Sequence, residues 1–138
     1  MPAKDIYHDS VRNTLIKDRW TITHDPLTLR VGRKDLFIDL GAEKFLAAEK
    51  QGRKIAVEIK SFIGVSEVED LKNALGQYIL YQNVLEITEP ERELFLAIRT
   101  NIYTEIFEEL IGKILLDKKL IKLIVFDADE EVIVKWIS

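Results

Sequence analysis

The fold of this chain is decided by the stretch Lys54-Ile55-Ala56-Val57-Glu58-Ile59-Lys60 and by the pattern that follows it from Ser66. In residues 54–60 apolar side chains occupy every second position, which predicts a β-strand. The sequence Ser66-Glu67-Val68-Glu69 is typical of a capping box, so a long helix is expected to start there. Thr88-Glu89-Pro90 ends that helix, and the apolar run 94–98 predicts a buried strand. A strand, a helix and a second strand in this order predict parallel pairing if the helix is a crossover.

Helical periodicity predicts two further features. Tyr7, Val11 and Leu15 lie four residues apart and predict a first helix that ends near Asp18. In the long helix, the residues expected to face the core are Val68, Leu71, Leu75 and Ile79. Near the C-terminus, one helix is predicted from apolar residues at three- and four-residue steps, namely Tyr103, Ile106, Phe107, Leu110 and Ile114.

Strands are predicted at 20–23, 27–31, 36–40, 120–126 and 132–137, from β-branched and aromatic runs bounded by turn residues. Residues 42–50 are compatible with a short helix or a strand, and we leave this open. The resulting order, αβββ(β or α)βαβαββ, predicts an α/β fold with a central mixed sheet flanked by helices. At 138 residues, the chain is expected to form a single domain.

Composition excludes several functional classes. The sequence has no cysteine, which rules out disulfides, thiolate zinc sites and a cysteine nucleophile. It has no glycine-rich phosphate loop, no dinucleotide fingerprint and only two histidines. A net charge of −4 gives no global sign of nucleic-acid binding, so any such binding must be local or assisted by a metal. The absence of a long apolar segment or a signal peptide predicts a cytoplasmic protein without a membrane partner.

The chemistry that remains is that of carboxylates. Asp39 lies in the otherwise apolar stretch Leu36-Phe37-Ile38-Asp39-Leu40, where alternation puts Ile38 and Leu40 on one face and Asp39 on the other. Glu58 and Lys60 share one face of their strand. If Asp39 and Glu58 face each other across neighbouring strands, they can bind Mg²⁺ or Mn²⁺, with the backbone carbonyl of Ile59 as a further ligand. Lys60 would then stabilise or orient an attacked phosphate.

A simpler interpretation exists for each of these residues. A Glu-x-Lys pair on a strand is often a surface ion pair worth about 0–1 kcal/mol. Asp39 within an apolar strand is harder to explain in that way. Together, the three residues predict metal-dependent phosphodiester hydrolysis with Asp39, Glu58 and Lys60 as catalytic residues.

The same residues resemble the signature of the PD-(D/E)xK nuclease superfamily, which has an acidic residue on one strand and (D/E)-x-K on the next. Gln77-Tyr78-Ile79-Leu80-Tyr81 is similar to the Gln-x-x-x-Tyr pattern of its RecB-like branch. This resemblance implies a restriction endonuclease-like fold, in which Gln77 and Tyr81 support the site or contact nucleic acid. Without it, Gln77 would be an exposed helical residue and Tyr81 an aromatic residue at the edge of the core.

Two positions differ from the superfamily pattern. Ile38 replaces the proline of the signature. A further glutamate is common on the first helix of the superfamily, and His8 and Asp9 are the candidates in the matching region here.

Over nearly its whole length the chain also resembles the XisH family, the fdxN element excision controlling factors of cyanobacteria. The closest similarity lies in residues 45–50 and 56–62. The resemblance implies a role in controlling site-specific excision of a DNA element, with a recombinase and an XisI-type protein as partners. This resemblance does not by itself imply cleavage, so two functions are open. One is a metal-dependent DNA endonuclease-like activity, which the carboxylates and the nuclease signature predict; the other is a non-catalytic factor that binds DNA, a recombinase or an XisI-type partner through a nuclease-like fold.

Two groups of basic residues are candidates for contacts with phosphate, or are ordinary solvated loops. The first precedes the Asp39 strand and the second lies at the Gln51-Gly52 turn; they are Arg30, Arg33 and Lys34, and Lys50, Arg53 and Lys54. The C-terminal strand 132–137 is a candidate edge strand for pairing with a partner or with a second copy in a homo-oligomer.

Overall fold

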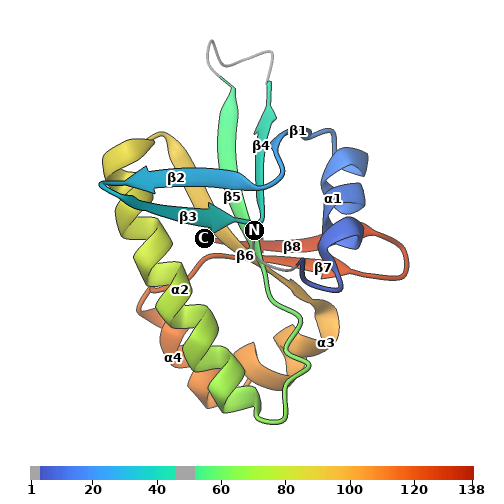
Figure 1. Cartoon of the computed structure of the whole chain (residues 1–138). Helices are drawn as coiled ribbons and strands as arrows, with labels where there is room; N and C mark the ends of the chain where they lie inside the picture. Colours follow the sequence, from blue (N-terminus) through green and yellow to red (C-terminus); the bar gives the residue numbers. More distant parts are fainter. Residues whose placement is uncertain (1–3, 46–51) are drawn as a thin grey trace.

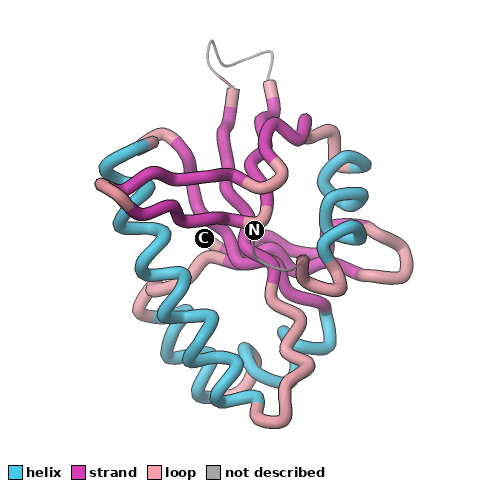
Figure 2. The backbone as a smooth tube through the Cα atoms, in the orientation of Figure 1, coloured by secondary structure: helices cyan, strands magenta, loops and turns pink. Residues whose placement is uncertain are grey.

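The structure is a computed structural model that describes residues 4–45 and 52–138 (Figure 1). It has a mixed α/β arrangement, in which helices and strands alternate over the second half of the chain (Figure 2). In chain order the elements are α1 (His8–Lys17), β1 (Thr21–His24), β2 (Leu27–Val31), β3 (Lys34–Ile38), β4 (Leu40–Lys44), β5 (Arg53–Ile59), α2 (Glu67–Thr88), β6 (Arg92–Arg99), α3 (Thr100–Ile102), the π-helix η1 (Tyr103–Phe107), α4 (Leu110–Asp117), β7 (Leu123–Asp127) and β8 (Val132–Ile137).

The main sheet has six strands in the order β1-β4-β5-β6-β7-β8. The central pairs β5–β6 and β6–β7 are parallel, and the outer pairs are antiparallel. The long helix α2 connects β5 to β6, so the predicted crossover with parallel pairing is confirmed, as is the central mixed sheet. Strands β2 and β3 form a separate antiparallel two-stranded sheet, which we call the ribbon.

Each face of the main sheet is covered by its own hydrophobic core. Helix α1 packs on one face, and α2, the α3–α4 region and the ribbon pack on the other. The strand β5 follows the predicted alternation. Ile55, Val57 and Ile59 belong to the core beneath α1, whereas Ala56 belongs to the core beneath α2. By the same alternation, Glu58 lies on the α2 side of the sheet.

Helix α2 begins at the predicted cap, because the Ser66 hydroxyl accepts a hydrogen bond from the Glu69 amide at 3.2 Å. The predicted core face is wrong in part. The buried residues of α2 are Leu71, Ala74, Tyr78 and Leu85. Ile79 is exposed because it does not lie at a three- or four-residue step from the buried residues. Val68 does lie three residues before Leu71, but in the first turn of α2 it borders a hollow that is open to solvent, and it is exposed as well.

Asp39 does not lie within a strand, which corrects the predicted strand 36–40. The strand β3 ends at Ile38 and β4 begins at Leu40, so Asp39 is the residue at which the chain passes from the ribbon to the main sheet. Ile38 and Leu40 therefore pack into different cores, not on one shared face. The sequence leaves residues 42–50 open between a short helix and a strand. Residues 42–44 belong to the strand β4, and residues 46–51 lie outside the described residues.

The single helix predicted from Tyr103 to Ile114 is also wrong. The chain forms α3, then the π-helix η1, and restarts as α4 after Phe107, which leaves Leu110 and Ile114 exposed. The short α4 packs closely on η1 at Gly112. A Cβ atom added there would lie 2.3 Å from the Ile106 carbonyl oxygen. None of the helices in the described part of the chain has the length and apolarity needed to cross a membrane.

Two glycines provide a matched test of this packing. We expect Gly112→Ala to destabilise the protein by about 1–3 kcal/mol, because the methyl group would push α4 away from η1. Gly76→Ala, in the interior of α2, would meet no atom within 4 Å and is expected to stabilise by about 0.5–1 kcal/mol. Thermal unfolding of both variants measures the effects. Equal stabilities for the two variants would contradict the close packing of α4 on η1.

Candidate functional site

A cavity of about 320 Å³ lies on the α2 side of the sheet, where β5 ends. The structure brings to it six residues that the sequence predicts as site residues, namely Asp39, Glu58, Ile59, Lys60, Gln77 and Tyr81. They come from the ribbon-to-sheet junction, from β5 and the residue after it, and from α2. The other residues that line the cavity are Lys4, Asp5, Asp35, Leu36 and Phe37.

Asp39 and Glu58 are held next to each other by the backbone. Leu40 pairs with Val57 in the antiparallel β4–β5 ladder, which places Asp39 opposite Glu58. The Asp39 amide donates a hydrogen bond to Glu58 Oε1 at 3.3 Å, and the Ile59 amide donates one to Asp39 Oδ2 at 2.8 Å. Each carboxylate is thus positioned by a backbone amide, and the two acids meet at one wall of the cavity.

This arrangement is costly for two negative charges. Glu58 is only 8% exposed. The pKa of Glu58 is raised from 4.5 to about 10, first by burial and then by the neighbouring Asp39 carboxyl group, and the positive charge of Lys60 offsets only part of this rise. Without a cation, the pair therefore favours a state in which Glu58 holds a proton. A divalent cation between the carboxylates would remove the need for that proton.

Lys60 and the residue after it are fixed by contacts to both sides. The Lys60 amide donates to the Ala97 carbonyl at 3.2 Å, and the Ser61 amide donates to Asp5 Oδ2 at 3.1 Å. The Arg99 guanidinium donates to the Ser61 carbonyl at 2.7 Å. These contacts hold the backbone at the mouth of the cavity, from which Lys60 extends.

Gln77 and Tyr81 are one helical turn apart on α2, so both face the cavity. Burial raises the pKa of Tyr81 to about 12, and the negative charges of Glu58 and Asp39 act in the same direction. The Tyr81 phenol therefore stays protonated at neutral pH and is available as a hydrogen-bond donor.

The structure does not bring the first-helix candidates His8 and Asp9 to the cavity. His8 is buried, and its Nε2 lies 2.7 Å from Asp25 Oδ1, while Asp9 is exposed near Lys4. Neither residue lines the cavity, because His8 and Asp9 are the first residues of α1 and face other surroundings. The acid that reaches the cavity is Asp5, ahead of the helix, where it also accepts a hydrogen bond from the Tyr7 amide. No motif in the sequence marks Asp5, since its role depends on a contact with Ser61, 56 residues away.

The two basic groups differ in their surroundings. Arg53 lies over the rings of Trp20 and Trp136 and pairs with Glu93 at 3.4 Å, and Lys54 lies between Glu43 and Glu91. Their charges are thus engaged within the chain, and Lys50 lies outside the described residues. In the ribbon, Arg30 pairs with Asp35, whereas the side chains of Arg33 and Lys34 are exposed and have no ion-pair partner among the described residues.

The donors present are few but suit a magnesium ion. Within residues 4–45 and 52–138, no group of three or more His, Asp or Glu side chains is arranged to hold a metal ion. The cavity supplies the Asp39 and Glu58 carboxylates, and Ile59 is part of its lining. Magnesium in proteins commonly takes one or two carboxylates and completes its shell with water and substrate phosphate oxygens. The residues therefore fit such an ion, with most of the coordination left to solvent or substrate.

Comparison with known proteins places the chain in a family. The family model described as "XisH protein" matches residues 1–134. The chain belongs to the XisH family. No curated protein matches it significantly.

Two solved structures are similar to this XisH-family chain over almost its full length. An XisH family protein from Nostoc punctiforme PCC 73102 is 38% identical, with a TM-score of 0.87, over 97% of this chain and 100% of that chain. An fdxN element excision controlling factor protein from Anabaena variabilis is 39% identical, with a TM-score of 0.86, over 98% of this chain and 100% of that chain. The mixed sheet flanked by helices is therefore shared by these XisH-family structures.

Proposed function

We propose that this XisH-family chain is a metal-dependent DNA endonuclease of the PD-(D/E)xK type that acts in the control of site-specific excision of a DNA element. The observation that carries the proposal is the meeting of Asp39 and Glu58 at the wall of a cavity that Lys60 also lines. The excision role is supported by the similarity to the Anabaena variabilis fdxN element excision controlling factor. A site-specific recombinase and an XisI-type protein are the partners that this role implies.

The fold supports the nuclease assignment. The superfamily signature has an acidic residue on one strand and (D/E)-x-K on the next, and here the acid stands at the junction immediately before its strand. Here Asp39 precedes β4, and Glu58 lies near the end of β5, the strand that β4 pairs with. The Gln77 and Tyr81 pair of the RecB-like branch lies across the same cavity.

Asp39 and Glu58 would hold a magnesium or manganese ion, with the Ile59 carbonyl as a further ligand. Such an ion, when bound, neutralises charge on a phosphodiester and makes a bound water more acidic. Lys60 lines the same cavity and would place a positive charge against the attacked phosphate as negative charge develops on it. Gln77 and Tyr81 would donate hydrogen bonds to the phosphate or the sugar and hold the strand in place.

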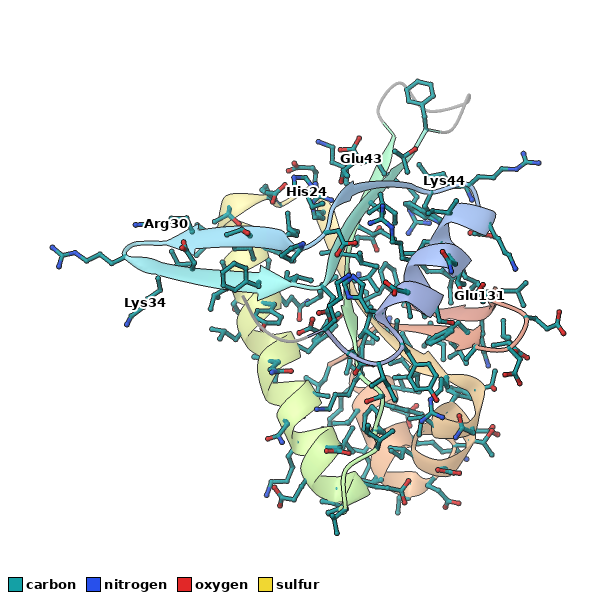
Figure 3. All side chains as sticks on the ribbon, turned by 45° about the vertical axis from the view of Figure 1, so that its right-hand side comes forward. His24, Arg30, Lys34, Glu43, Lys44 and Glu131 are labelled. Carbon is teal, nitrogen blue, oxygen red and sulfur yellow. The ribbon has the colours of Figure 1, made fainter. Side chains whose placement is uncertain are left out.

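The ribbon is suited to hold the DNA backbone beside this cavity. Its strand β3 contributes Asp35, Leu36 and Phe37 to the cavity wall. The opposite end of the ribbon carries basic residues, and Figure 3 shows Arg30 and Lys34 extending away from the body of the protein there. A DNA duplex with its scissile phosphate in the cavity would therefore lie along the ribbon, and the basic residues at the turn of the ribbon would contact its backbone phosphates.

Removing the charges at the end of the ribbon tests this placement. We expect Arg33→Ala with Lys34→Ala to weaken DNA binding and to make the affinity less dependent on salt. The slope of log affinity against log salt should fall by about 0.9 for each phosphate that the double variant no longer neutralises. Lys113→Ala with Lys118→Ala, on exposed lysines of α4 and its C-cap, is the matched control and should leave both quantities unchanged. Fluorescence anisotropy at several salt concentrations measures them. An equal effect of the two double variants would argue against ribbon contacts.

The experiment that tests the proposed function is a cleavage assay. Linear, supercoiled and branched DNA are incubated with the protein and Mg²⁺ or Mn²⁺, with and without the XisI-type partner, beside Glu58→Gln. We expect metal-dependent cleavage that Glu58→Gln and a chelator both abolish. If no DNA is cleaved under any condition while DNA or partner binding remains intact, the chain is the non-catalytic factor and the nuclease proposal is overturned.

A further inference from the structure

A second hollow lies at the end of the molecule where α2 begins, between the first turns of α2 and the η1–α4 region (Figure 1). Its volume is about 200 Å³. Its lining residues are Glu67, Val68, Leu71, Glu105, Ile106, Glu109 and Ile111, and we call this hollow the acidic groove. It shares no lining residue with the candidate active site, so the proposed nuclease chemistry leaves it without a role.

The floor of the acidic groove is apolar and open to solvent. Leu71 and Ile106 are buried at its base, while Val68 is 51% exposed and Ile111 is 46% exposed. Close to these in the sequence, Val65 and Leu110 are exposed as well. Exposed apolar residues are ordinary when scattered singly, but around one hollow they are typical of a protein-binding surface.

The rim of the groove carries a single sign of charge. Glu67, Glu105 and Glu109 line it, and none of the three forms an ion pair with the described residues. Glu67 and Glu109 stand at the starts of α2 and α4, where the helix dipole stabilises a negative charge in place. A ligand with positive charges around an apolar stripe would satisfy both the rim and the floor.

The charge of the rim also argues against a second copy as the occupant. A symmetric dimer through this surface would bring the same patch of each copy together, and so would place glutamates against glutamates. A basic partner has no such penalty.

We propose that the acidic groove docks an amphipathic helix of a partner protein, with apolar residues at i, i+3, i+4 and i+7 and with Lys or Arg beside them. The apolar stripe packs on Val68 and Ile111, and the basic residues pair with Glu67, Glu105 and Glu109. This docking does not depend on the nuclease activity. It gives the chain a protein contact separate from the cavity and the ribbon proposed to hold DNA.

The experiment uses a synthetic helical peptide of about 18 residues, made of leucine and lysine in this pattern, and a scrambled peptide of the same composition. Calorimetry at physiological salt is expected to show binding of the patterned peptide at least about tenfold tighter than binding of the scrambled one. Val68→Asn, which removes an apolar contact without adding charge, and Glu105→Lys are each expected to weaken that binding by about fivefold or more. Asp117→Lys makes the same change of charge at the C-terminal end of α4, away from the groove. It is the matched control and should leave peptide binding unchanged.

Three results would overturn the proposal. They are equal binding of the two peptides, equal weakening by Asp117→Lys and Glu105→Lys, and self-association of the protein that Val68→Asn abolishes, which would assign the groove to a second copy. Because Val68 and Glu105 lie outside the candidate active site, DNA cleavage should be the same in these variants as in the wild type. Peptide binding therefore tests the docking proposal, and DNA cleavage tests the nuclease proposal, independently of each other.

Discussion

Lys60→Ala is expected to reduce the rate of DNA cleavage by a factor on the order of 10²–10³, the usual cost of losing one charged group that stabilises a transition state. Lys60 lines the cavity beside the two carboxylates, and among the described residues the other basic side chain in the lining is that of Lys4. Binding of Mn²⁺ should persist or become slightly tighter, since an ammonium group is not a metal ligand and its charge repels a cation.

Single-turnover cleavage of a plasmid and calorimetric titration with Mn²⁺ measure the two effects separately. Lys72→Ala is a suitable control, because Lys72 is an exposed lysine on α2 that pairs with Glu69. Cleavage by Lys60→Ala at the wild-type rate would remove Lys60 from the catalytic residues.

Glu58→Gln is expected to make the metal-free protein more stable at neutral pH while abolishing cleavage. The pKa of Glu58 rises from 4.5 in the unfolded chain to about 10 in the folded one. Between these values the folded chain holds a proton that the unfolded chain has lost, so stability falls as the pH rises through this window. A glutamine side chain is neutral at every pH, so Glu58→Gln removes the free-energy cost of protonating the carboxylate on folding. The expected gain at pH 7 is on the order of 1–3 kcal/mol.

Thermal unfolding from pH 4 to pH 9 in the presence of a chelator tests this sign. The two proteins should be nearly equal at pH 4 and should diverge as the pH rises. Addition of Mg²⁺ should then raise the melting temperature of the wild type and leave that of Glu58→Gln unchanged. If Glu58→Gln is less stable than the wild type at pH 7 without metal, Glu58 is a structural carboxylate, not one held at a cost for function.

The parts of the fold that the sequence predicts well are those that local patterns determine. The alternation in β5 and the Ser66 cap of α2 depend on neighbouring residues, and both are found in the structure. The sequence predicts a meeting of Asp39 with Glu58 and Lys60 on the condition that their strands are neighbours, and β4 and β5 do pair. The place of Gln77 and Tyr81 beside them follows from the resemblance to the nuclease superfamily, not from a local pattern.

The parts that the sequence does not predict depend on contacts between distant segments. At Asp39 the chain passes from the ribbon to the main sheet. The alternation of apolar and polar residues along the sequence does not reveal this change of sheet. The break after Phe107 depends on how closely α4 approaches η1 at Gly112, although the apolar spacing continues through it. Asp5 is held at the candidate site by a hydrogen bond from the Ser61 amide, and the His8 ring contacts Asp25 instead of the cavity. Both are contacts between segments far apart in the sequence.

The most direct test of the account is calorimetric titration of the purified protein with Mn²⁺, beside Asp39→Asn, Glu58→Gln and the control Asp25→Asn. Asp25 is a partly buried carboxylate as well, but its partners are His8 and Arg12 and it lies outside the cavity. The account predicts binding to the wild type and to Asp25→Asn, and loss of binding in the other two variants. Absence of binding at millimolar Mn²⁺, or binding that survives both Asp39→Asn and Glu58→Gln, would contradict it.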